Sequence, residues 1–118
     1  MAYVDGFVIP VPKRNLKAYR RMAAKAAKIW REHGALEVRE CVGDHLKTKG
    51  VMTFPRQTKM KPGETVLFSW IVYRSRKSRD RVLKKVMSDP RVAKTSPKIM
   101  PFDVKRMAYG GFKVIVAA

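Results

Sequence analysis

The sequence has few of the residues that build metal sites and disulfides. It contains one cysteine and two histidines among 118 residues. A single thiol cannot form an internal disulfide, and one thiol with two imidazoles cannot complete a typical closed zinc site. No phosphate-binding loop, nucleophile motif or metal-ligand spacing appears either. We therefore expect no metal and no other cofactor.

Long hydrophobic runs are also missing. No apolar run approaches the ~20 residues that a membrane-spanning helix needs. The first apolar run follows no basic segment, unlike that of a secretory signal peptide. These absences favour a cytoplasmic location without a membrane partner. The length of 118 residues and the hydrophobic content of 46% predict a single globular domain over residues 1–118.

Acidic residues are scarce relative to basic ones. Nine Asp and Glu stand against 27 Lys and Arg, which gives a net charge of +18. Such a charge attracts polyanions at long range and in a salt-dependent way. The basic residues are spread along the chain, and the densest stretch, residues 74–85, has no interleaved aromatic residue for base stacking. The charge therefore predicts weak, non-specific association with nucleic acid as a side effect.

Hydrophobic periodicity predicts two helices. The first follows Asn15, a candidate N-cap, with apolar residues at helical spacing and lysines and arginines on the opposite side. The second follows Ser75, which can also act as an N-cap, and has a narrower apolar stripe. A short extra turn is expected after Ser88, because Pro90 fits the first turn of a helix.

The remaining segments read as strands and loops. Residues 3–12, 35–42, 65–74 and 104–116 are rich in β-branched and aromatic residues. Gly110 and Gly111 indicate a bulge or a close backbone approach in the last strand. Residues 43–50 and 94–103 are polar or proline-containing loops, residues 51–60 are a further extended segment, and Pro62 and Gly63 fit a type II turn.

This order of elements predicts an α+β fold. The sequence β-α-β-β-α-β is typical of a ferredoxin-like protomer, with an antiparallel sheet and both helices on one face. The first, third and fourth strands are apolar on both faces, so the face without helices also needs a cover. A second copy packed sheet to sheet would supply it, which predicts a homodimer.

Five blocks of sequence resemble one family. The blocks "YVDGFVIPVP", "FPR", "KPGETVLFSWIVY", "MSDPR" and "MPFDVKRMAYGGF" look like the YbaA-like family of small, uncharacterised bacterial proteins, in the same order and over nearly the whole chain. The resemblance implies a dimeric α/β barrel. Two departures stand out: Val104 replaces a usual glycine, and the loop at residues 43–50 is basic where relatives tend to be acidic. Many relatives are nearly neutral or acidic, so a shared function would not require the charge of +18.

Asp5 is the first candidate for chemistry. Strand alternation places it with Tyr3 and Phe7 on one face of a central strand, where a carboxylate is costly unless it is paired. The neighbouring last strand offers Lys105 and Arg106 as cations. Two readings stay open, namely a structural ion pair that fixes the strand register and a pocket carboxylate with a shifted pKa.

The segment before and within the last strand adds further candidates. Arg106 could bind a carboxylate or phosphate, and Tyr109 could donate a proton or a hydrogen bond. Asp103 and Lys105 lie beside them and complete the set of candidate ligand-binding residues. The alternative is that Asp103 only starts the strand and Tyr109 only packs.

Cations at the two helix starts form another candidate set. Such residues can join free backbone N–H groups in binding an anion or a nucleic-acid phosphate, although as solvated charges they need no partner. These residues are Lys13, Arg14, Arg76 and Lys77.

Three functions remain open from the sequence. The first is a dimeric barrel that binds or transforms a small, potentially anionic molecule in a cleft between helices and sheet. The second is non-specific nucleic-acid or polyanion binding through the charge of +18. The third is a structural dimer without a ligand. The pocket hypothesis requires a cleft lined by Asp5, Arg106 or Tyr109, and the sequence does not decide whether the protein is an enzyme.

Overall fold

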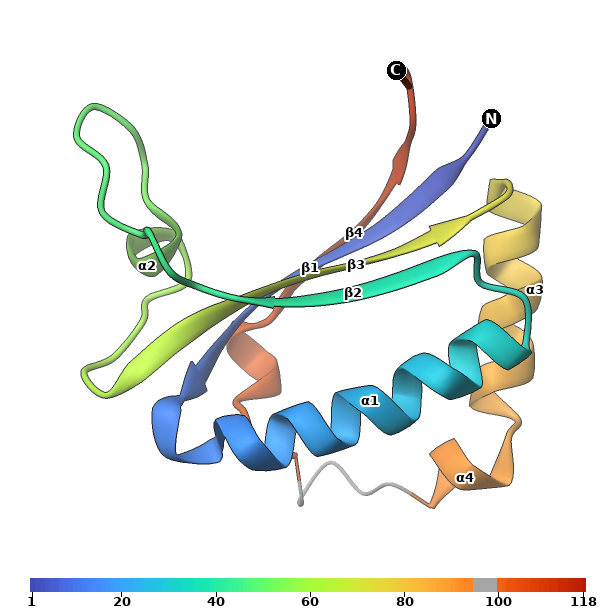
Figure 1. The fold of residues 1–118 in the computed structure, drawn as a ribbon, viewed down its shortest axis with the longest axis horizontal. Helices are drawn as coiled ribbons and strands as arrows, with labels where there is room; N and C mark the ends of the chain where they lie inside the picture. Colours follow the sequence, from blue (N-terminus) through green and yellow to red (C-terminus); the bar gives the residue numbers. More distant parts are fainter. Residues whose placement is uncertain (95–99) are drawn as a thin grey trace.

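The protein folds into one antiparallel sheet with its two long helices packed against the same face (Figure 1). This computed structural model describes residues 1–94 and 100–118. The elements in chain order are β1 (Tyr3–Pro12), η1 (Lys13–Asn15), α1 (Leu16–Glu32), β2 (Glu37–Val42), α2 (Phe54–Gln57), β3 (Glu64–Tyr73), α3 (Arg76–Met87), α4 (Pro90–Ala93), η3 (Val104–Arg106) and β4 (Ala108–Lys113).

The strand order in the sheet is β2-β3-β1-β4, and every neighbouring pair is antiparallel. β1 is central: Asp5 lies opposite Ile71 of β3 and opposite Gly111 of β4. The expected mixed α/β fold with a four-stranded antiparallel sheet is confirmed. Residues on alternate positions of each strand therefore face either the helices or the opposite side.

Local sequence explains the start of α3 but not that of α1. Ser75 Oγ accepts a hydrogen bond from the backbone N–H of Ser78 at 3.1 Å, so the predicted cap is confirmed. Asn15 occupies the predicted N-cap position of α1, but its side chain makes no cap hydrogen bond. Instead, Asn15 Nδ2 donates to the carbonyl of Pro101 at 2.9 Å, a contact between distant parts of the chain.

Two segments differ from their predicted conformations. Residues 54–57, within the segment expected to be extended, form the short helix α2, whose first backbone groups are capped by Thr53. The last strand begins at Ala108, because the preceding residues turn into η3, where Asp103 accepts from the backbone N–H of Lys105 at 3.0 Å. Of the loop expected at residues 94–103, residues 95–99 lie outside the described residues.

Gly110 and Gly111 form no bulge. They pair in regular register with Gly6 and Asp5 of β1. A close approach does occur, since a Cβ atom on Gly111 would lie 2.4 Å from Tyr3 Oη. A side chain at position 111 would therefore displace the Tyr3 ring.

The core lies between the sheet and the helices, and Phe7 packs against both of its parts. One part joins the C-terminal half of α1 to β3 and α3, and the other joins α1 to β1 and the start of β3. The buried core residues are Ile29, Ala35, Ile71, Tyr73, Val82 and Val86 in the first part and Ile9, Val11, Tyr19, Ala23 and Leu67 in the second.

Neither α1 nor α3 covers the opposite side of the sheet, which we call the open sheet face, although the short helix α2 lies on that side at one end (Figure 1). Phe68 and Phe112 are 43% and 61% exposed there. The Phe68 ring lies 5.8 Å from Trp70 and 5.9 Å from Phe54, between ring centroids. A shallow apolar groove of about 500 Å³ runs along this face. Its lining residues are Val4, Gly6, Val8, Phe68, Trp70, Val72, Ala108, Tyr109, Gly110 and Phe112.

Across residues 1–94 and 100–118, none of the helices has both the length and the apolar composition that a membrane crossing demands.

Candidate functional site

Asp5 is fully buried in the middle of the sheet, with 0% of its surface exposed. Arg79 reaches it from α3, with Nη1 at 3.3 Å from Asp5 Oδ1. The same guanidinium donates to Tyr109 Oη at 2.9 Å and to Tyr3 Oη at 3.3 Å. Its central carbon lies 4.9 Å from the centroid of the Tyr3 ring. One arginine thus ties α3 to the two strands β1 and β4.

The predicted cation beside Asp5 is wrong. Arg106 precedes β4, and its guanidinium binds both oxygens of Glu64 at 2.7 Å each. It also binds Asp103 at 3.1 Å. Lys105 is exposed. Because residues 104–106 form η3 and leave the sheet, they cannot reach the Asp5 carboxylate. Of the residues singled out in this segment, Tyr109 alone joins Asp5.

The second carboxylate oxygen of Asp5 has a different environment. Oδ2 is buried, and no group in the described part of the chain makes a hydrogen bond to it. The hydroxyls of Tyr73 and Tyr109 lie near the carboxylate, and hydrogen bonding to Asp5 is one of the effects that raise the pKa of each phenol. Burial, and then the negative charge of Asp5, raises the pKa of Tyr73 and of Tyr109. Both phenols are therefore neutral and keep a proton to donate.

A cavity of about 510 Å³ opens beside this carboxylate, between the helices and the sheet. This volume falls within the range of small-molecule sites. Asp5 and Tyr109 lie at its wall, and most of the remaining lining is apolar. The other lining residues are Phe7, Ile9, Tyr19, Met22, Ala23, Ala26, Ala27, Trp30, Val38, Glu40, Ser69, Ile71, Leu83, Met87, Met100, Phe102, Val104 and Met107.

Glu40 supplies a second carboxylate to this cavity. It lies on β2 opposite Ser69 of β3, and its Oε1 accepts from Tyr19 Oη at 2.7 Å. Burial by the packing around it raises the pKa of the Glu40 carboxyl, against the effect of hydrogen bonds from Tyr19 and Ser69. Because Glu40 is exposed to solvent, this rise is smaller than full burial would give.

Sequence reasoning missed Arg79 and Glu40, although a signal for each was present. Arg79 precedes Val82, Leu83 and Val86 by three, four and seven positions, so helical periodicity places it on the buried stripe of α3. Glu40 lies two positions after Val38 in its strand, so the two side chains share the inward face. A charged residue at a position that the pattern places inside was thus the sequence signal for each of these two site residues.

The candidate anion residues at the helix starts lie far apart. Lys13 and Arg14 are exposed in η1, and Arg76 and Lys77 are exposed at the start of α3. The two starts lie at opposite ends of the sheet (Figure 1). They therefore form no common site.

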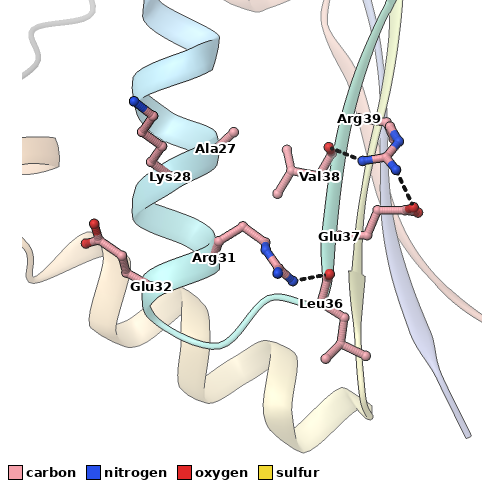
Figure 2. A pocket seen from close by; sticks show the side chains of 8 residues that line it. All are labelled: Ala27, Lys28, Arg31, Glu32, Leu36, Glu37, Val38 and Arg39. Atoms are coloured by element: carbon pink, nitrogen blue, oxygen red, sulfur yellow. Dashed lines mark hydrogen bonds and ion pairs between the residues drawn. The ribbon is translucent and has the colours of Figure 1, made fainter.

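A second groove, of about 540 Å³, lies between α1 and the edge strand β2 (Figure 2). Its arginines are engaged locally. Arg31 Nη1 donates to the carbonyl of Leu36, and Arg39 donates to the carbonyl of Val38 at 3.3 Å and contacts Glu37 at 3.1 Å. These guanidinium groups are already held by backbone carbonyls and by Glu37, so the groove is a weak candidate for an anion site.

No metal centre is formed by the residues that the structure describes, because no three His, Cys, Asp or Glu side chains gather closely enough. His33 and two nearby acids instead take part in an ion-pair network. His33 Nε2 lies 2.8 Å from Asp89 Oδ2, and Arg91 contacts both Asp89 and Glu32. Hydrogen bonds from Arg91 and His33 lower the pKa of Asp89. This network joins the end of α1 to α4.

The contact between Arg106 and Glu64 predicts a pH effect. The Glu64 side chain is 7% exposed, and hydrogen bonds from Arg106 lower its pKa from 4.5 to about 2. Because the folded-state pKa is the lower one, this stabilisation is present above pH 4.5 and disappears as the pH falls towards 2. We expect Arg106→Gln to lower the free energy of unfolding near neutral pH by about 1–2 kcal/mol, after allowance for solvent screening.

Urea unfolding at several pH values between about 7 and 2 tests this expectation. The difference between wild type and Arg106→Gln should shrink as the pH falls below 4.5. Lys105→Gln removes the same charge from an exposed neighbour and should leave the pH profile unchanged. A constant difference across this pH range would contradict the assignment to Glu64.

A family model and similar known proteins place this chain in the same family. Residues 2–104 match the family described as "Protein of unknown function (DUF1428)". The "Uncharacterized protein YbaA" of Escherichia coli (strain K12) and that of Shigella flexneri are each 48% identical over 116 residues, which cover 98% of either chain. The solved structure of "De novo designed protein Foldit4" has a TM-score of 0.50 at 12% identity, covers 97% of this chain and 99% of its own, and supports the fold alone. On the extent of these sequence matches, the chain belongs to the YbaA (DUF1428) family.

Proposed function

We propose that this protein binds a small, mainly apolar molecule in the cavity between helices and sheet. The molecule donates a hydrogen bond to Asp5 Oδ2. The observation that carries this proposal is a fully buried carboxylate oxygen that lines an apolar cavity and has no partner among the described residues.

The two carboxylate oxygens of Asp5 differ in their hydrogen-bond partners. Oδ1 is satisfied by Arg79, which fixes the carboxylate in place. A buried acceptor left without a donor costs about 1–3 kcal/mol, and a bound donor would recover that free energy. A purely structural ion pair would need no cavity beside its second oxygen. The site is therefore built to gain from a ligand that carries an O–H or N–H group.

A hydrogen bond from a ligand to Asp5 Oδ2 would also allow proton transfer. A carboxylate that accepts a hydrogen bond from a bound molecule is also placed to accept its proton. Tyr109, which Arg79 holds at 2.9 Å, is a neutral donor at the same wall of the cavity. The site could thus serve binding alone or a proton-transfer reaction, and binding is the property to test first.

Ligand binding can be followed through tryptophan fluorescence. Trp30 lines the cavity and Trp70 lies on the open sheet face, so Trp70→Phe leaves a single reporter at the cavity. We expect 3-phenylpropan-1-ol to perturb Trp30 emission and to bind more tightly than propylbenzene, which lacks the hydroxyl. Asp5→Asn should weaken the alcohol about tenfold or more. Arg79 will hold the amide oxygen, which leaves an NH₂ donor where Oδ2 accepted.

Asp44→Asn is the matched control, because it makes the same change at an exposed loop position. Asp44→Asn should leave the affinities for 3-phenylpropan-1-ol and for propylbenzene unchanged. Asp5→Asn should also leave the affinity for propylbenzene unchanged, because propylbenzene makes no hydrogen bond to Asp5. Urea unfolding of each variant separates binding from stability. If neither probe binds the wild type and Asp5→Asn only loses stability, Asp5 is structural and the proposal fails.

A second copy of the chain is the proposed cover of the open sheet face. Paired face to face, two ferredoxin-like protomers would form the dimeric α/β barrel that the family resemblance implies. The exposure of Phe68 and Phe112 and the apolar groove beside them support this arrangement. Contiguous apolar surface of this kind is rare on soluble monomers and marks interaction sites. A two-fold axis would place the same apolar strip on both partners.

Phe68→Glu tests the dimer. A charge at the centre of the open sheet face should convert a dimer to a monomer, because an ionised carboxylate would be buried without a partner. Light scattering at about 10 µM measures the mass. Leu36→Glu is the control, since Leu36 is 46% exposed and lies at the groove between α1 and β2. A wild-type monomer at this concentration would exclude the arrangement.

Polyanion binding is a second candidate, favoured by one observation. The outward surfaces of α1 and α3 carry many exposed cations. These residues are Lys17, Arg20, Arg21, Lys25, Lys28 and Arg31 on α1 and Arg76, Lys77, Arg81, Lys84 and Lys85 on α3. In a cytoplasmic protein, which the sequence favours, such a surface would meet nucleic acids. We expect weak, sequence-independent association.

Fluorescence anisotropy with two unrelated DNA duplexes tests this candidate. Affinity should be equal for both duplexes and fall steeply with salt, because phosphate contacts release counterions. The pair Lys84→Gln and Lys85→Gln should weaken it more than the charge-matched pair Lys47→Gln and Lys49→Gln in the exposed loop. Sequence-dependent affinity that survives ~0.2 M salt would show that the binding is specific.

A further inference from the structure

The lining of the cavity contains acids but no bases, although Arg79, just outside the lining, is paired with Asp5. The cavity wall contains two carboxylates, Asp5 and Glu40, and no lysine, arginine or histidine among the described lining residues. The whole chain has 27 Lys and Arg but nine Asp and Glu. Cations are thus kept out of the wall, while two of the few acids are placed in it. An anionic ligand, which the sequence left open, would find no cation lining this cavity.

The two carboxylates lie on strands separated by one other strand. Asp5 on β1 faces Ile71 of β3, and Glu40 on β2 faces Ser69 of β3. Two strand spacings and an offset of two residues put their Cα atoms roughly 12 Å apart. Both residues line the same cavity, so one small molecule can lie between them.

Aromatic side chains line the space around the carboxylates. Trp30, Tyr19 and Phe102 contribute to the wall, and the last two rings are in edge contact with centroids 5.7 Å apart. Aromatic faces attract cations, with a gain of about 0.5–2 kcal/mol that increases when the cation is desolvated. The wall therefore offers a cation both a carboxylate partner and aromatic contacts.

We propose that the ligand of this cavity is a small apolar amine, bound as its ammonium ion with the nitrogen at Asp5 Oδ2. This inference rests on the proposed binding function and names the ligand class. An ammonium group donates up to three hydrogen bonds and brings a positive charge to a wall that holds Glu40 and the Arg79-paired Asp5, whereas an alcohol donates one and brings none. The apolar part of the ligand packs against Trp30 and the methionines of the wall.

The net charge of the protein gives this ligand class a distinctive salt dependence. A charge of +18 repels a free cation at long range, and added salt screens that repulsion. The affinity for an amine should therefore rise or stay level as salt increases, whereas polyanion affinity falls. A contact between the amine and exposed carboxylates would instead weaken with salt.

Calorimetry on the unmodified protein tests the proposal with three probes of one shape. They are 3-phenylpropylamine, 3-phenylpropan-1-ol and 3-phenylpropanoate at neutral pH. We expect the amine to bind at least about tenfold more tightly than the alcohol and the carboxylate to bind weakest. Asp5→Asn should reduce amine affinity about tenfold or more, Glu40→Gln should reduce it several-fold, and Asp44→Asn should not change it.

The outcomes separate this inference from the proposed function. If the alcohol binds as tightly as the amine, the amine assignment is overturned while the cavity remains a binding site. If the carboxylate probe binds best, the assignment is also overturned. If no probe binds, both proposals fail. Should Asp5→Asn not fold, the order of the three wild-type affinities and the effect of Glu40→Gln, at a partly exposed position, still decide the question.

Discussion

The buried ion pair between Asp5 and Arg79 is the constraint on which the helix side of the molecule depends. The carboxylate stands at the centre of β1 with no exposed surface, so it requires a cation, and that cation must come from α3. Removing one partner of such a pair costs about 3–5 kcal/mol, because the other charge remains buried. The same helix supplies Leu83 and Met87 to the cavity wall. The position of Arg79 therefore sets both the packing of α3 and the shape of the cavity.

Local signals in the sequence were sufficient for the two long helices, the first three strands of the sheet and the burial of Asp5, but not for α2 or the start of β4. Strand alternation placed this carboxylate inside, and the cap at Ser75 gave the start of α3. The identity of its cation was missed because Arg106 was assumed to lie within the last strand. Where that strand begins depends on the contact between Arg106 and Glu64, which are 42 positions apart. A contact between such distant residues leaves no periodic pattern in either segment.

The volume and the full lining of the cavity lie beyond sequence reasoning for a related reason. Its volume depends on how far the helices stand from the sheet, and side chains such as Trp30 help to set that distance. Trp30 Nε1 donates to Tyr73 Oη at 3.2 Å, which holds α1 over β3. The alternation of β2 could have shown that Glu40 points inward, but no pattern could have shown that Glu40 and Asp5 share one space.

The ion pairs use very few of the cations. In the part of the chain that the structure describes, every contact between a carboxylate and a lysine or arginine uses Arg39, Arg79, Arg91 or Arg106, and no lysine takes part. Exchanging exposed lysines for neutral or acidic residues would therefore break none of these pairs. Most of the charge of +18 thus rests on residues whose loss would leave these internal contacts in place, so the surface of this chain can change its charge without changing its interior.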